Sequence, residues 1–80
     1  MQNRVIASLE NPYGDRCVDI FVRSDGSFGF EEFRRDAEDC GTWQPLNTYS
    51  RLVFASYDDA LASARKYVAW FSQLPLASSR

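Results

Sequence analysis

The sequence contains no histidine, and its two cysteines, Cys17 and Cys40, are too few for a disulfide framework. Histidine is the usual general base near neutral pH and the commonest metal ligand, so its absence removes most hydrolytic and zinc chemistry. The spacing of the two cysteines also matches no paired zinc-ligand motif. We therefore expect a non-enzymatic cytoplasmic protein that carries no metal and no cofactor.

Basic charge and long apolar runs are also scarce. Nine Lys and Arg residues stand against eleven Asp and Glu residues, which gives a formal charge of −2. Without a basic excess, the long-range attraction that brings proteins to nucleic acids and anionic membranes is missing. The run Val5-Ile6-Ala7 is shorter than the roughly 7 to 15 apolar residues of a signal peptide, and no run approaches the roughly 20 residues of a membrane span. We expect no membrane association.

The sequence does contain enough apolar character to fold. Hydrophobic residues make up 45% and aromatic residues 15%, whereas disordered chains combine low hydrophobicity with unbalanced charge. The length suits one hydrophobic core. We predict a single domain over residues 1–80, with a folded core at 16–73 and a frayed tail at 74–80. Residues 1–15 are expected to form either an edge strand or a loose arm.

Two segments rich in β-branched and aromatic residues, 16–23 and 27–35, predict a β-hairpin. A two-residue turn at Asp25-Gly26 would scatter the apolar side chains over both faces. A three-residue loop with Gly26 in the left-handed conformation instead gives one continuous apolar face. At about 25 cal/mol per Å² of buried apolar surface, the difference is several kcal/mol and favours the three-residue loop. This register forms two apolar pairs, Val22 with Phe28 and Ile20 with Phe30.

The rest of the chain predicts a loop, a strand and a helix. Residues 36–41 are acidic and lack a clear period, so they are expected to form part of a long loop that continues past Trp43. Alternation over residues 49–55 predicts a third main strand. Ser56 is suited to cap a helix that begins at Tyr57 and ends near Gln73, before Pro75. The fold class is therefore α+β, an antiparallel three- to four-stranded sheet with one C-terminal helix packed on one face.

The helix stripe and the apolar hairpin face predict the core. The stripe recurs at three- and four-residue steps, which places its members on one side of the helix. The expected core residues are Val18, Ile20, Val22, Phe28, Phe30, Leu61, Ala64, Val68 and Phe71.

The order of these elements resembles the YegP-like units of bacteria. The features that carry the resemblance are the hairpin turned at Asp25-Gly26, the irregular loop, the strand, and the junction Ser56-Tyr57-Asp58-Asp59-Ala60 that opens the helix. The resemblance covers residues 16–71 and implies a small β-β-β-α fold, while it says little about activity because that family is largely uncharacterised. The acidic residues 36–41 and Trp70 depart from its pattern.

The predicted binding site is the second face of the sheet. One helix covers only one face, and apolar groups gathered on the other face mark partner surfaces. The register places Phe21, Phe33 and Cys17 on this face, with Arg51 and Val53 nearby if the third strand joins the sheet. We expect a protein-interaction or self-association module whose partner is another protein or a second copy. The alternative is purely structural: residues 1–15 or the Trp43 loop cover these rings.

Trp70 is a second candidate because it lies about 120° from the centre of the helix stripe. An exposed Trp beside Lys66 and Tyr67 would suit an interface anchor. Alternatively, the N-terminal segment or Trp43 packs over it.

Three further hypotheses have weaker support. Single-stranded nucleic acid could stack on Phe21 and Phe33 beside nearby arginines, but carboxylates lie in the middle of the same hairpin. The acidic residues Asp36, Glu38 and Asp39, with Asp58 and Asp59, match no metal-binding loop. Cys40 has an acidic neighbour and no histidine to activate it, so we expect an unreactive thiol.

Overall fold

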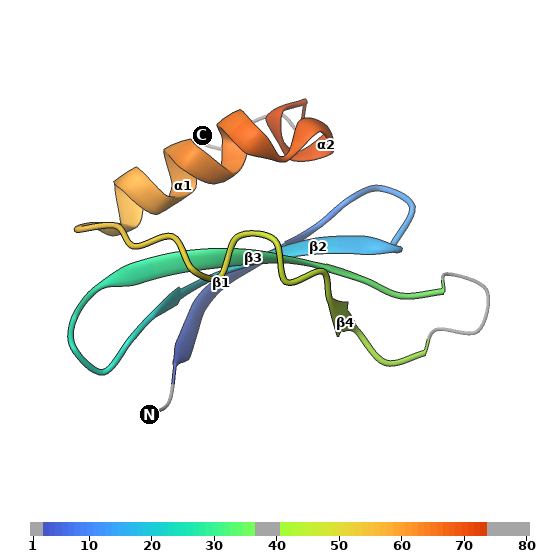
Figure 1. Ribbon diagram of the computed structural model, residues 1–80. Helices are drawn as coiled ribbons and strands as arrows, with labels where there is room; N and C mark the ends of the chain where they lie inside the picture. The colour runs from blue at the N-terminus through green and yellow to red at the C-terminus, as the bar shows by residue number, and fades with distance from the viewer. Residues whose placement is uncertain (1–2, 37–40, 74–80) are drawn as a thin grey trace.

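The computed structural model describes residues 3–36 and 41–73. Within these residues four strands precede two helices: β1 (Arg4–Glu10), β2 (Arg16–Val22), β3 (Phe28–Arg34), β4 (Gln44–Pro45), α1 (Tyr57–Tyr67) and α2 (Ala69–Ser72). The strands form an antiparallel sheet in the order β1-β2-β3-β4. Both helices lie on one side of this sheet (Figure 1). The predicted α+β class and the single helical layer are confirmed.

The hairpin of β2 and β3 has the register predicted by the three-residue loop. Val22 pairs with Phe28 and Ile20 with Phe30. Gly26 adopts a φ of 89°, a left-handed conformation that costs glycine little. Ser27 donates to the Asp25 carboxylate from its backbone N–H at 2.9 Å and from its hydroxyl at 2.7 Å. These hydrogen bonds from Ser27 hold the pKa of Asp25 below its usual range.

The N-terminal segment forms an edge strand. β1 pairs with β2 along its length, and a β-bulge between Val5 and Ala7 interrupts the ladder. The turn that follows is fixed by Asn11, whose side-chain oxygen accepts from the backbone N–H groups of Asp15 and Arg16 at 3.1 Å each. Asparagine favours such turns because its side chain can replace a backbone acceptor.

The predicted third strand at residues 49–55 is wrong. Only Phe54 bridges to the sheet, exchanging two backbone hydrogen bonds of 2.8 Å with Phe28. The strand next to β3 is instead Gln44–Pro45, which pairs with Phe33 and Arg34. Proline is tolerated there because an edge strand does not need its N–H. Side chains of Arg23 and Glu31 occupy backbone groups that a strand at 49–55 would need.

The helix begins as predicted but does not run unbroken to Gln73. Ser56 accepts from the backbone N–H of Asp59 at 3.1 Å and caps α1. Val68 is extended, with φ −99° and ψ 105°, and separates α1 from α2. Valine is β-branched and a weak helix former, so interrupting the helix at Val68 costs little free energy. Val68 and Phe71 are both buried. The break between the helices therefore allows both side chains to pack in the core.

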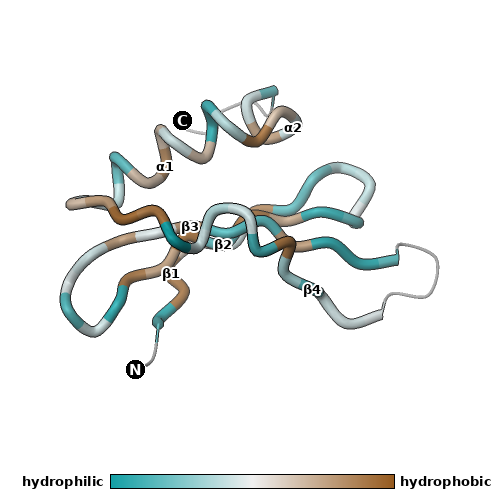
Figure 2. Tube along the Cα trace, in the orientation of Figure 1, coloured by the Kyte–Doolittle hydropathy of each residue, from teal (hydrophilic) through white to brown (hydrophobic). Residues whose placement is uncertain are grey.

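The core lies between the helices and the sheet. Val18, Ile20 and Phe30 supply its sheet side, and α1 buries only Ala60 and Ala64, small residues that let the helix approach closely. Figure 2 shows apolar stretches in both layers. Most of the predicted core is confirmed, but Val22, Phe28 and Leu61 are only partly buried, and the prediction omitted Ala60.

Candidate binding groove

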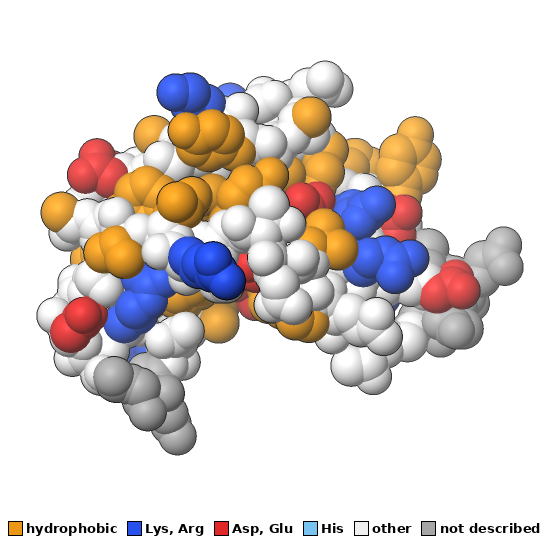
Figure 3. All heavy atoms as spheres, viewed as in Figure 1, with side chains coloured by type: hydrophobic (Ala, Val, Ile, Leu, Met, Phe, Trp, Pro, Cys, Tyr) orange, Lys and Arg blue, Asp and Glu red, His pale blue; other side chains and the backbone are white. Residues whose placement is uncertain are grey.

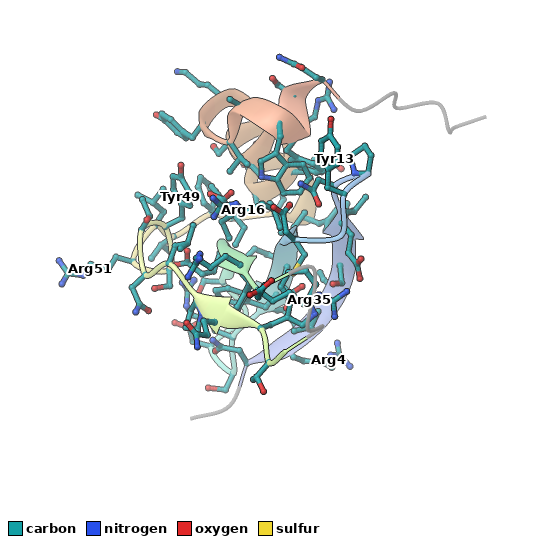
Figure 4. The ribbon with its side chains drawn as sticks, turned by 90° about the vertical axis from the view of Figure 1, so that its right-hand side faces the viewer. Arg4, Tyr13, Arg16, Arg35, Tyr49 and Arg51 are labelled. Atoms are coloured by element: carbon teal, nitrogen blue, oxygen red, sulfur yellow. The ribbon has the colours of Figure 1, made fainter. Side chains whose placement is uncertain are left out.

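The sheet surface opposite the helices, called here the reverse face, is not as bare as predicted. Phe21 is 6% exposed and Cys17 is 4% exposed, so neither side chain is free to meet a partner. Phe33 is half-buried on the same face, while Arg51 points away from the sheet into solvent (Figure 4). The chain after β4 runs along β3 toward α1 (Figure 1). The predicted uncovered face is therefore wrong for Phe21 and Cys17.

Phe21 is buried against a glycine and an arginine. A Cβ atom at Gly29 would lie 2.9 Å from Cε1 and Cζ of Phe21, so the ring rests on the bare backbone of the neighbouring strand. The guanidinium of Arg23 lies over the ring, 5.0 Å from its centroid, and its Nη2 would lie 2.7 Å from the same Cβ atom at Gly29. Arg23 also donates to the carbonyl oxygens of Ser50 and Leu52 at 2.8 and 3.1 Å. The Arg23 side chain thus covers the Phe21 ring and binds the loop that contains Ser50 and Leu52.

Glu31 binds the same loop by accepting hydrogen bonds from the loop's backbone N–H groups. Its side chain is almost fully buried, with 3% exposure. The carboxylate accepts hydrogen bonds from the backbone N–H groups of residues 48–50 at 2.8 to 3.2 Å, and from that of Glu32 at 2.9 Å. Asn47 precedes this turn with a φ of 57°, in the left-handed region that asparagine tolerates. Charge-assisted hydrogen bonds of this kind can hold a buried carboxylate without a counter-ion.

Beside Phe21 and Glu31 the reverse face retains a groove of about 260 Å³. Its floor contains Asp19, Phe21 and Phe33, and its rims carry Val5 of β1 and Pro45 of β4. Val5 is 51% exposed, so the β1 rim is open to solvent. Like most binding sites, the groove is concave and mainly apolar, with a few polar groups in its lining.

Asp19 is the second carboxylate that lines the groove, beside Glu31. Its Oδ1 accepts from the hydroxyl of Ser8 at 2.6 Å and lies 3.9 Å from the sulfur of Cys17. No cationic side chain in the described ranges lies within ion-pairing distance of Asp19. Asp19 is half-buried, so it remains accessible from the groove.

Cys17 is a structural residue. Burial, with the carboxylates of Asp19 and Glu10 close by, raises the pKa of its thiol to about 11. A thiol that stays protonated at neutral pH is a poor nucleophile. The other cysteine, Cys40, and the acidic residues Glu38 and Asp39 lie outside the described residues. The part of the chain that the structure describes holds no cluster of three metal-ligating side chains.

Trp70 is half-buried on the flank of the helical layer. Its indole N–H donates to the carboxylate of Glu32 at 2.8 Å, and its ring meets that of Phe71 edge-on. A second cavity of about 230 Å³ separates Trp70 from the β1–β2 turn, where Tyr13 is 83% exposed. Figure 4 shows Tyr13 beside the helical layer. The Trp43 ring lies against Arg35 instead, 4.3 Å from that guanidinium.

Other exposed apolar side chains lie away from the groove. Leu52, Val53 and Tyr67 are between 39% and 67% exposed. Figure 3 shows a band of hydrophobic side chains between the helical layer and the sheet. Exposed apolar residues are ordinary on protein surfaces when no concavity joins them. Val53 is therefore a suitable matched control for Val5.

No family model, curated protein or solved structure matches the chain. The resemblance to YegP-like units has no matching protein behind it, and residues 49–55, which carried part of it, form no strand. Neither helix of the described ranges has the length and apolar character of a membrane span.

Sequence reasoning found part of this site. It placed Phe21 and Phe33 on one face, and the register behind that placement is confirmed. It missed the roles of Arg23 and Glu31, because a side chain that binds a loop distant in sequence leaves no local pattern. Glu31 falls on the face that the sequence predicted to be open, where a charged residue is ordinary, so its burial left no local signal.

Proposed function

We propose that this chain is a non-enzymatic protein-interaction module, which holds a segment of another protein in the groove on the reverse face. The observation that carries the proposal is the groove itself, an open apolar concavity with half-buried Phe33 in its floor and exposed Val5 on its rim. Large aromatic side chains in concave patches are typical binding anchors. We place this activity in the cytoplasm, where a buried free thiol such as Cys17 remains reduced.

The size of the groove favours a side chain over a small metabolite. Cofactor and metabolite sites usually enclose roughly 300 to 1,000 Å³ and bury most of the ligand. At about 260 Å³ this groove is smaller, and it opens to solvent along β1. A single large side chain from an extended segment fits such a space.

The groove is also a better candidate than the edge of the sheet. An edge strand presents unpaired backbone groups that can pair with another strand. The bulge between Val5 and Ala7 interrupts this edge, and bulges are a common protection against strand addition. A second copy of the chain could still supply the bound segment, so self-association is one form of the same proposal.

Nucleic acid is the less favoured partner. Asp19 and Glu31 are paired across the strands in the middle of the reverse face. Carboxylates there would repel a phosphate backbone, and Phe21 is too deeply buried to stack with a base.

Selection from a displayed peptide library tests the proposal. The bait is the full chain, and the selected peptides are then measured against two matched variants, Val5→Glu and Val53→Glu. Both changes place a carboxylate at an exposed valine, but only Val5 lines the groove. We expect Val5→Glu to weaken binding at least tenfold and Val53→Glu to leave it unchanged.

Equal loss with both variants, or no loss with either, would place binding elsewhere and contradict the proposal. Light scattering over a concentration series tests the self-association form. A monomer at every concentration removes that form and leaves a different protein as the partner.

A further inference from the structure

We infer that the groove receives an arginine side chain of the partner segment, whose guanidinium pairs with Asp19 and stacks on Phe33. This inference rests on the proposed function and names the chemistry of the segment that the groove binds. It follows from the charge of the floor, from the aromatic contacts on the same face and from the dimensions of the groove.

The charge of the groove floor favours a cationic ligand. Asp19 is half-buried in the floor, and no cation of the described residues pairs with it. The carboxylate of Glu31, which also lines the groove, is engaged by four backbone N–H groups. Glu31 thus adds to the negative potential while Asp19 keeps acceptor capacity for a ligand. A cationic group is the ligand that this arrangement attracts.

Aromatic rings next to Phe33 already carry arginine side chains. Arg23 lies over Phe21 at 5.0 Å, and Arg35 lies over Trp43 at 4.3 Å. Both distances are within the range of cation–π contacts. Phe33 lies on β3 between these two pairs, and none of the described cations lies over its ring. A guanidinium from the partner would give Phe33 the contact that its neighbours already have.

The shape of the groove favours arginine over lysine. A guanidinium is planar, so it can stack on Phe33 and still direct N–H groups toward a carboxylate. The ammonium of lysine is a compact, strongly hydrated charge that does not stack. The apolar rims formed by Val5 and Pro45 suit the aliphatic stem of the arginine side chain.

The inference is tested by NMR titration of the isotope-labelled full chain with capped tripeptides. The probes are Gly-Arg-Gly, its neutral isostere Gly-citrulline-Gly, and Gly-Leu-Gly. We expect saturable shifts of the amides of Val5, Phe33 and Ser50 with the arginine peptide. Citrulline should bind about tenfold more weakly, the loss expected for one charge-assisted hydrogen bond. Asp19→Asn should lower the affinity for arginine to that for citrulline.

Glu10→Gln is the matched control, because Glu10 lies on the same strand pair but is 4.0 Å from Arg35 and does not line the groove. It should leave the affinity for arginine unchanged. Equal binding of all three peptides at the groove would overturn the arginine assignment while the groove remains a protein-binding site. Absence of saturable shifts at the groove with every peptide would overturn the proposed function as well. If Asp19→Asn does not fold, the comparison of arginine with citrulline on the natural chain decides the inference.

Discussion

The burial of Glu31 predicts a large effect from a very small change, Glu31→Gln. The substitution keeps the shape of the side chain but replaces one carboxylate oxygen with an NH₂ group. In the native structure each oxygen accepts two backbone N–H groups, those of Tyr49 and Ser50 at one oxygen and those of Thr48 and Glu32 at the other. The glutamine therefore keeps only half of these hydrogen bonds, and its NH₂ group faces two backbone N–H groups that are also donors.

The magnitude follows from the two hydrogen bonds that the NH₂ group cannot accept. A hydrogen bond to a charged group contributes about 1.5 to 3 kcal/mol, so removing two of them costs about 3 kcal/mol or more. Thr48 and Ser50 are exposed, so their amides recover part of this by binding water. We expect the free energy of unfolding to fall by about 2 kcal/mol, which for a domain of this size lowers the melting temperature by roughly 8 to 16 °C.

Urea unfolding gives the total effect, and amide hydrogen exchange gives its location. The amides of residues 48–50 should exchange faster in the variant, while those of Val18 and Ile20 change little. Glu32→Gln is the control, because Glu32 bonds only the Trp70 indole through its side chain among the described residues, and a glutamine oxygen can still accept that bond. It should cost below about 1 kcal/mol. Equal stability of Glu31→Gln and Glu32→Gln would refute the role assigned to Glu31.

Three further predictions follow from the packing and from the buried thiol. Gly29→Ala should destabilise the chain by about 1 to 3 kcal/mol in a urea melt, because the new Cβ would lie 2.9 Å from the Phe21 ring; an unchanged midpoint would contradict this contact. Phe71→Ala should cost about 3 to 5 kcal/mol, whereas Leu61→Ala, at a partly buried position, should cost about 1 to 2 kcal/mol; the reverse order would contradict the core described here. Since the folded pKa of Cys17 is raised from 9.0 to about 11, its stabilising contribution is complete below pH 9 and is lost as the pH rises toward 11. The unfolding free energy should therefore fall less steeply over this pH window in Cys17→Ala than in the natural chain, and parallel slopes would exclude the shift.

The hairpin was predictable because its determinants are local. Gly26 permits the left-handed turn, and the two-residue period of the strands allows only one register that gathers the apolar side chains on one face. The cap at Ser56 was predictable for the same reason, since its hydrogen bond to Asp59 spans three residues.

Residues 49–55 could not be assigned correctly from the same kind of pattern. The alternation of Leu52 and Phe54 is that of a strand, but strand formation depends on free backbone partners. In the folded chain Glu31 takes the amides of residues 48–50, and Arg23 takes the carbonyl groups of Ser50 and Leu52. These hydrogen bonds join segments 17 to 29 residues apart, so no local rule anticipates them.

The sequence predicts which side chains form the floor of the candidate site, but it does not predict what covers them. The strand register alone places Phe21 and Phe33 on the reverse face. Whether those rings are exposed depends on Arg23 and on the loop, which cover Phe21 and leave Phe33 half-buried in a groove.

A partner segment that lies in this groove must bring its side-chain protons close to those of the groove residues. The most direct measurement is the set of intermolecular nuclear Overhauser contacts between a bound, selected peptide and the methyl and ring protons of the chain. We predict contacts from one peptide side chain to Phe33 and Val5. Contacts confined to Tyr13 and Trp70, or to Val53 and Tyr67, would contradict the claim.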